Sequence, residues 1–208
     1  MTRLVIFAKA PQAGTVKTRL IPALGADGAA TLARAMLAHT LQQALAAGLD
    51  AVELCMSPRP DDPAWRGVAL PAGVDYTAQG VGNLGERMDR AMQRALNLHQ
   101  GQVLLIGTDC PALGSEHLRE AARQLAQHDA VLLPVADGGY VLVGLRAPCP
   151  DVFANMPWST SRVAAETLHR LGALGLRVWQ GPMLRDIDEA ADLVHLPADF
   201  VAHAFSKR

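Results

Sequence analysis

The sequence has few aromatic residues, no excess of basic charge and no long apolar run. Phe, Trp and Tyr make up 4% of the 208 residues, so we expect a core built from Ala, Leu and Val. The formal net charge of −1 lacks the global basic excess that is typical of a general nucleic-acid-binding protein. No apolar run reaches the roughly 18 residues that a membrane-spanning helix needs. We therefore expect no nucleic acid among the partners and no membrane span.

Cysteine and histidine are too few and too irregularly spaced to predict a disulfide framework or a metal site of their own. The three cysteines are an odd number and form no C-x-x-C pair. The seven histidines show no H-x-x-x-H spacing. The apolar run near Met1 is too short for the h-region of a secretory signal peptide. The sequence thus predicts a cytoplasmic protein.

Short apolar runs alternate along the chain with longer amphipathic stretches. Hydrophobic residues at 50% and charged residues at 19% exclude a disordered or fibrous chain. The runs predict strands over Leu4–Phe7, Ala51–Met56, Val74–Thr77, Val103–Ile106, Ala130–Val135, Tyr140–Leu145 and Leu176–Trp179. Helical spacing predicts helices over Leu32–Leu45, Leu84–Ala95, Leu118–Leu125 and Val163–Leu171.

This alternation predicts an α/β fold, namely a single-domain three-layer α/β/α sandwich with a mostly parallel sheet over residues 1–208. The length agrees with the prior of roughly 100–200 residues per domain. In such sheets, ligands bind beyond the carboxyl ends of the strands. The polar residues that follow the predicted strands are therefore the candidates for function.

The loop after the first predicted strand gathers positive charge. Lys9, Lys17 and Arg19 surround Gly14, and no Asp or Glu occurs from Met1 to Ala26. Backbone amides and cationic side chains in one loop favour an anion such as phosphate. Val16 stands where a Walker A loop needs a glycine, so a P-loop NTPase is not indicated. The alternative is a solvated basic loop without a ligand.

A G-x-G-x-x-G pattern over Gly80–Gly85 is the strongest competing signal, because it formally fits a dinucleotide-binding fingerprint. The strand before it is short and polar, and Glu86 follows at the point where a pyrophosphate would approach the helix. We therefore keep an NAD-type protein as an alternative only.

Acidic residues follow two other predicted strands. Asp109 comes after the apolar strand Val103–Ile106, where a carboxylate is well placed to hold Mg²⁺ or Mn²⁺ against a substrate phosphate. Asp186 and Asp188 form a second acidic site and lie on the same side of an extended chain. The simpler interpretations are a turn residue for Asp109 and a helix N-cap for Asp188.

Two further segments predict walls of a pocket. Asp137–Tyr140 places paired glycines after an acid, which allows a ligand close to the backbone but is also a common hairpin signal. Pro157–Thr160 sets a Trp before a helix, where it could line an acceptor pocket while Ser159 or Thr160 caps the helix.

Taken together, these motifs resemble those of the glycosyltransferase-A-like group called selenodomain-associated transferase 1, which is related to molybdenum-cofactor and phospholactate guanylyltransferases. The resemblance rests on Phe7–Leu20, Gln79–Met88, Ile106–Pro111, Asp137–Leu145, Met156–Thr160 and Asp186–Asp188, in this order. It implies a nucleotide-diphospho-sugar transferase fold that binds an NTP or a sugar nucleotide together with Mg²⁺ or Mn²⁺.

The resemblance also implies residue roles. Lys17 and Asp109 would be catalytic, and Asp109 would hold the metal with Asp186 or Asp188 as its partner. Residues expected to bind the nucleotide or the acceptor are Ala8, Lys9, Ala10, Gly14, Lys17, Thr18, Arg19, Gln79, Gly80, Asn83, Leu84, Asp137, Gly138, Gly139, Tyr140, Trp158, Ser159 and Thr160.

The expected function is metal-dependent transfer of a nucleotidyl or glycosyl group from an NTP or sugar nucleotide to a small-molecule acceptor. The alternatives are a non-catalytic nucleotide-binding regulatory module and, with less support, the NAD-type protein.

Overall fold

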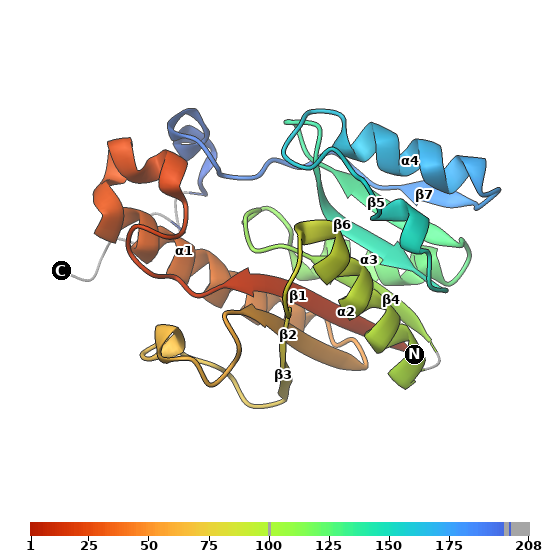
Figure 1. Cartoon of the computed structure of the whole chain (residues 1–208), viewed down its shortest axis with the longest axis horizontal. Coiled ribbons are helices and arrows are strands. Elements are labelled where there is room, and N and C mark those ends of the chain that lie inside the picture. The colour runs from red at the N-terminus through yellow and green to blue at the C-terminus, as the bar shows by residue number, and fades with distance from the viewer. Residues whose placement is uncertain (100, 198–199, 201–208) are drawn as a thin grey trace.

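The computed structural model describes residues 1–99, 101–197 and 200, and in this part of the chain a seven-stranded sheet carries helices on both faces (Figure 1). The strands are β1 (Thr2–Lys9), β2 (Ala51–Ser57), β3 (Val74–Ala78), β4 (Gln102–Ile106), β5 (Ala130–Pro134), β6 (Tyr140–Leu145) and β7 (Val178–Gln180). The helices are α1 (Ile21–Ala46), α2 (Leu84–His99), α3 (Ser115–Leu125) and α4 (Val163–Ala173). Short 3₁₀ helices are η1 (Thr18–Leu20), η2 (Pro63–Trp65), η3 (Pro150–Val152) and η4 (Ala190–His195). Each predicted strand and helix is present, so the predicted fold class is confirmed.

The strand order is β3-β2-β1-β4-β6-β5-β7, and all neighbours are parallel except β6, which is antiparallel to both β4 and β5. The alternation of strands and helices predicted a mostly parallel sheet but gave no sign of the reversed strand. Because of this reversal, the start of β6 lies at the same edge as the ends of β1 and β4. Among the described helices, none is long and apolar enough to cross a membrane.

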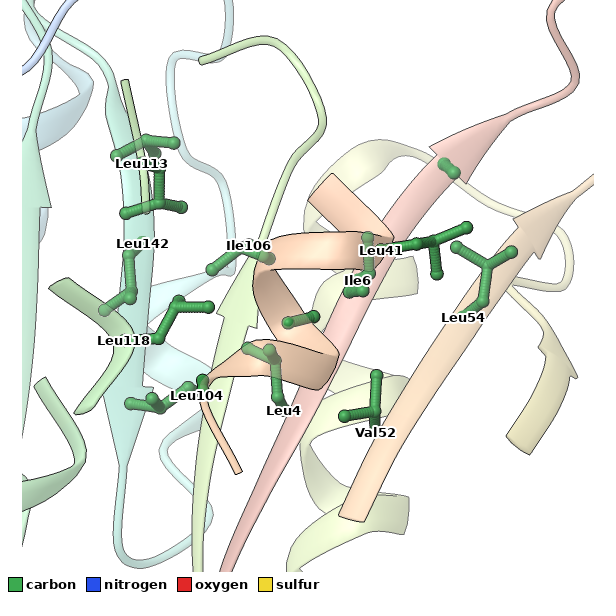
Figure 2. Close-up of a cluster of buried hydrophobic side chains, with 14 of the residues drawn as sticks. Leu4, Ile6, Leu41, Val52, Leu54, Leu104, Ile106, Leu113, Leu118 and Leu142 are labelled. Carbon is green, nitrogen blue, oxygen red and sulfur yellow. The ribbon is translucent and has the colours of Figure 1, made fainter. Parts of the chain in front are cut away.

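The two helical layers follow from the alternation of side chains along β1. Leu4 and Ile6 point to one face, where they pack with Leu41 of α1 and with α3 (Figure 2). Val5 points to the other face, toward Met92 of α2 and toward α4. On the first of these faces, Figure 2 shows Leu4, Ile6 and Leu41 among other aliphatic side chains, as expected of a core with few aromatic residues.

A network of charged side chains is buried between α2 and the β1–β3 part of the sheet. Glu53 of β2 has 1% of its side chain exposed, and its carboxylate accepts hydrogen bonds from Arg3 (3.0 Å), Thr77 (2.7 Å) and Arg94. Arg3 also donates to Asp75 at 2.8 Å, at the outer end of the network. A buried carboxylate needs such partners because removal from water disfavours its charge.

Candidate functional site

A cleft of about 770 Å³ opens at the edge of the sheet where β1 and β4 end. Its walls come from the loop after β1, the start of α2, the turn after β4, the β5–β6 turn and the loop before α4. Of the residues that the sequence singled out, those lining the cleft are Ala8, Lys9, Lys17, Thr18, Arg19, Gln79, Leu84, Asp109, Asp137, Gly139, Tyr140, Trp158, Ser159, Thr160 and Asp188. Segments far apart in the sequence therefore meet at one edge.

The remaining predicted residues lie outside the cleft lining. They are Ala10, Gly14, Gly80, Asn83, Gly138 and Asp186. Asp186 is half-buried, two residues before Asp188.

At one end of the cleft, the ammonium group of Lys17 lies between two carboxylates. Lys17 Nζ is 2.6 Å from Asp109 Oδ1 and 2.7 Å from Asp188 Oδ1, and it also donates to the carbonyl oxygen of Ile187 at 2.6 Å. Only 6% of the Lys17 side chain is exposed. The interpretation of the loop as a purely solvated basic segment is therefore wrong for Lys17.

Two opposing effects act on the charge of Lys17. Burial on its own lowers the pKa of Lys17, but the charges and hydrogen bonds of Asp109 and Asp188 outweigh it, and the pKa is raised. The ammonium therefore stays charged at neutral pH. The backbone of Lys17 is left-handed, with φ of +47°, a conformation that a non-glycine residue adopts only where its surroundings hold it there.

The acids at this end of the cleft meet one requirement of a divalent metal site. Asp109 and Asp188 direct one oxygen each to the same point, and Mg²⁺ usually takes one or two protein carboxylates plus phosphate oxygens. In the described residues, no cluster of three or more His, Cys, Asp or Glu side chains is arranged to hold a metal ion. The two carboxylates therefore fit a divalent metal ion whose remaining ligands include oxygens of a bound phosphate.

Asp186 and Asp188 have different environments. Asp188 contacts Lys17, whereas the pKa of Asp186 is raised to about 6, first by burial and then by the charges of Asp137 and Asp188. The N-cap alternative for Asp188 is wrong, because η4 has Glu189 at its N-cap. The pairing geometry thus favours Asp188 as the companion of Asp109.

The Gly80–Gly85 loop does not form an open phosphate site at the start of α2. The Asn83 backbone N–H donates to Glu86 Oε2 at 2.9 Å, and the Glu86 N–H donates to Asn83 Oδ1 at 3.1 Å. This reciprocal capping closes the helix N-terminus and places a carboxylate there. A dinucleotide site would need these amides for its pyrophosphate, so the geometry disfavours the NAD-type alternative.

Sequence reasoning missed Arg87 as a site residue. It lines the cleft and donates from Nη1 to Gln79 Oε1 at 2.8 Å, while Gln79 Nε2 donates to the carbonyl oxygens of Ala8 and Cys55. Its position one helical turn after Asn83 was the available signal, because residues four apart share a helix face. Arg87 thus joins Lys9 and Arg19 among the cations that line the cleft.

The loop before α4 faces the cleft from the opposite side. The rings of Tyr140 and Trp158 meet edge to face, with centroids 6.4 Å apart, and Ser159 and Thr160 follow at the rim. Thr160 Oγ1 accepts from the N–H of Arg162, the N-cap residue of α4, at 3.4 Å. The hairpin interpretation of Asp137–Tyr140 is confirmed, and the same turn also lines the cleft.

Gly138 holds this loop against the β5–β6 turn. Its φ is +90°, its carbonyl oxygen accepts from the Ala164 N–H at 2.8 Å, and a Cβ there would lie 2.0 Å from the carbonyl oxygen of Ser161. We expect Gly138→Ala to displace the Trp158 loop and to lower the free energy of unfolding by about 2 kcal/mol or more. Denaturant titration followed by Trp fluorescence measures both effects.

Gly175→Ala is the matched control for Gly138→Ala. Gly175 has a similar φ of +73° but nothing within 4 Å of its Cβ position, so it isolates the backbone strain from the clash. Equal effects of the two substitutions would contradict the docking role of Gly138.

The central part of the chain, residues 40–160, matches a protein-family profile described as "Uncharacterized protein conserved in bacteria (DUF2064)". The chain belongs to this family. The DUF2064 match covers α2, the turn after β4, the β5–β6 turn and most of the loop before α4, but it begins after the Lys17 loop. No curated protein sequence matches the chain.

Solved structures extend the likeness beyond the DUF2064 match. A candidate nucleotide-diphospho-sugar transferase from Desulfovibrio desulfuricans G20 is 32% identical, with a TM-score of 0.86 over 96% of this chain and 90% of that one. A manganese complex of Rv0371c from Mycobacterium tuberculosis H37Rv is 17% identical, with a TM-score of 0.55 over 94% and 97% of the two chains. A CMP:2-keto-3-deoxy-manno-octonic acid synthetase bound to CTP is 15% identical, with a TM-score of 0.59 over 97% and 99%. The last two likenesses show a shared fold.

Proposed function

We propose that this chain, as one domain over residues 1–208, transfers a nucleotidyl or glycosyl group from an NTP or sugar nucleotide to a small acceptor, with Mg²⁺ or Mn²⁺. The observation that carries the proposal is a single cleft that is lined both by Lys9, Arg19 and Arg87 and by the two carboxylates that converge on Lys17. The likeness to a candidate nucleotide-diphospho-sugar transferase at 32% identity supports it.

The donor side of the cleft has the chemistry that a polyphosphate needs. Lys9, Arg19 and Arg87 would bind phosphate oxygens through charge-assisted hydrogen bonds, and Asp109 and Asp188 would hold the metal. The metal would supply charge neutralisation for the phosphate leaving group. The protein itself would act mainly by positioning donor and acceptor in one cleft.

The acceptor side differs in charge. The described residues of the β5–β6 turn and the 157–161 loop that line the cleft include Asp137 and three hydroxyl side chains but no cation. We therefore propose an acceptor without a phosphate group, stacked near Trp158. The Asp137 carboxylate is the group on this wall that can accept a proton from an acceptor hydroxyl.

Thermal-shift measurements with NTPs and sugar nucleotides, with and without Mn²⁺, test the donor. A ligand that binds the folded state and not the unfolded one raises the unfolding temperature, and the rise grows with the logarithm of the ligand concentration relative to its dissociation constant. Incubation with each stabilising donor and with unphosphorylated or phosphorylated sugars then reports the reaction. Released pyrophosphate indicates nucleotidyl transfer from an NTP, and a released nucleoside monophosphate or diphosphate indicates glycosyl transfer from a sugar nucleotide. Stabilisation without any product would support the non-catalytic nucleotide-binding module instead.

Arg19→Ala is expected to weaken donor binding about tenfold, because one charge-assisted phosphate contact is lost. The Arg19 side chain is 63% exposed, and its Nη1 lies 3.5 Å from Glu189 Oε1, so it is free to turn toward a phosphate. Titration of the stabilising nucleotide measures the dissociation constant. Glu189→Gln breaks the same ion pair from the other side and is expected to leave affinity within twofold. Equal losses in the two variants would argue that the ion pair, not a phosphate contact, is responsible.

A further inference from the structure

The Lys17 ammonium occupies the point between Asp109 and Asp188 where a divalent cation would contact both carboxylates. All three of its polar contacts are 2.6–2.7 Å long, and two of them are to carboxylates that keep 52% and 39% of their side chains exposed. The carboxylates can thus be reached from the cleft, whereas the ammonium between them is almost fully enclosed.

We propose that Lys17 is an internal stand-in for the metal, and that a divalent cation binds at Asp109 and Asp188 only when a donor phosphate takes over the Lys17 ammonium. This inference rests on the proposed function. A monovalent and a divalent cation between the same two oxygens would repel each other strongly at this short range. The metal and the ammonium are therefore alternatives at this point.

The cost of displacing Lys17 depends on what else can pair with it. An ammonium that leaves both carboxylates while still enclosed would be an unpaired buried charge, which is strongly unfavourable. The cleft that Lys17 lines also holds Lys9 and Arg19, which are placed for phosphate binding. Phosphate oxygens bound there would be new negatively charged partners for the ammonium in place of the two carboxylates.

Metal and donor binding are then thermodynamically linked through Lys17. Each ligand raises the affinity for the other by the same factor, because each makes the displacement of Lys17 easier. The long, flexible lysine side chain can make this change by rotation about its own bonds, without movement of β1 or α1. Lys17 thereby acts as a positioning residue that keeps the metal site closed until the donor is bound.

A Mn²⁺ titration in the absence of any nucleotide tests this directly, with electron paramagnetic resonance reporting free Mn²⁺. Lys17→Met keeps the length of the side chain and removes its charge, so we expect Mn²⁺ to bind about tenfold or more tightly than to the wild type. Such a gain cannot come from misfolding. Lys17→Gln, a second neutral variant, should show the same direction.

Two controls assign the gain to this site. Lys9→Met removes the same charge from the same cleft without touching either carboxylate, so its Mn²⁺ affinity should change less than twofold. Adding Asp109→Asn to Lys17→Met should abolish the gain.

Two results would overturn the inference: no gain in Mn²⁺ affinity in Lys17→Met and Lys17→Gln, or a gain that survives Asp109→Asn. None of these titrations contains a nucleotide. A failed nucleotide screen would therefore count against the proposed function and leave this result standing.

Discussion

Asp109→Asn is expected to fold like the wild type and to lose at least about 100-fold in turnover, because one of two charged metal ligands and a charge partner of Lys17 disappear together. The fold should persist because the structural role of Asp109 belongs to its backbone, whose carbonyl oxygen accepts from the Ile187 N–H at 2.8 Å. The side chain is 52% exposed. Steady-state rates with Mn²⁺ and the unfolding temperature measure the two properties separately.

Asp151→Asn is the matched control for Asp109→Asn, since it makes the same change on an exposed side chain in η3, outside the cleft lining. It should leave both rate and stability unchanged. If Asp109→Asn instead kept its Mn²⁺-dependent nucleotide stabilisation in full, Asp109 would be a turn residue, and the metal assignment would be wrong.

Glu53→Gln is expected to lower the free energy of unfolding by about 3 kcal/mol or more, because it leaves two guanidinium groups without their shared buried anion. Glu53 is 1% exposed and accepts hydrogen bonds from Arg3, Thr77 and Arg94. The N–H groups of the new amide would also face the N–H groups of Arg3 and Arg94, so donors would meet donors. Urea titration with an unchanged slope would show that stability, rather than the unfolded state, has changed.

Asp75→Asn removes another acidic partner of the same Arg3 but at the exposed end of the network, where 62% of the side chain is accessible. An exposed ion pair contributes roughly 1 kcal/mol or less, so the expected loss is small. A loss as large as that of Glu53→Gln would show that position in the network, and therefore burial, does not decide the effect.

The strand and helix pattern was readable from the sequence because its periodicities are local. Val103–Ile106 and Ala130–Pro134 are continuously apolar, which is typical of strands covered on both faces. The direction of β6 was not readable, because the pairing partner of a strand depends on distant segments. The boundaries of β7 also shifted, from a predicted Leu176–Trp179 to Val178–Gln180, as expected for a short edge strand with weak patterning.

The candidate site was predictable in composition but not in pairing. The rule that ligands bind beyond strand ends brought Lys17, Asp109 and Asp188 to one edge of the sheet. The sequence assigned Lys17 and the two acids to separate roles. In the structure Lys17 contacts both Asp109 and Asp188, although Asp188 lies 171 positions away along the chain. Such contacts follow from the three-dimensional meeting of β1, β4 and the segment after β7, which no local pattern encodes.

Because β6 runs in the reverse direction, the strands at the two halves of the cleft are joined to their neighbours by different kinds of connection. The parallel strands β1 and β4 leave the cleft through helices that must cross the whole layer before the next strand begins. The β5 and β6 strands are instead joined by a tight turn, which ends in Tyr140, directly at the cleft. Surface turns tolerate insertions far better than crossover connections do. A change of length in this turn would therefore alter the acceptor half directly while Lys9 and Asp109 keep their places, and the turn can be varied only at positions other than Gly138, which holds the loop before α4.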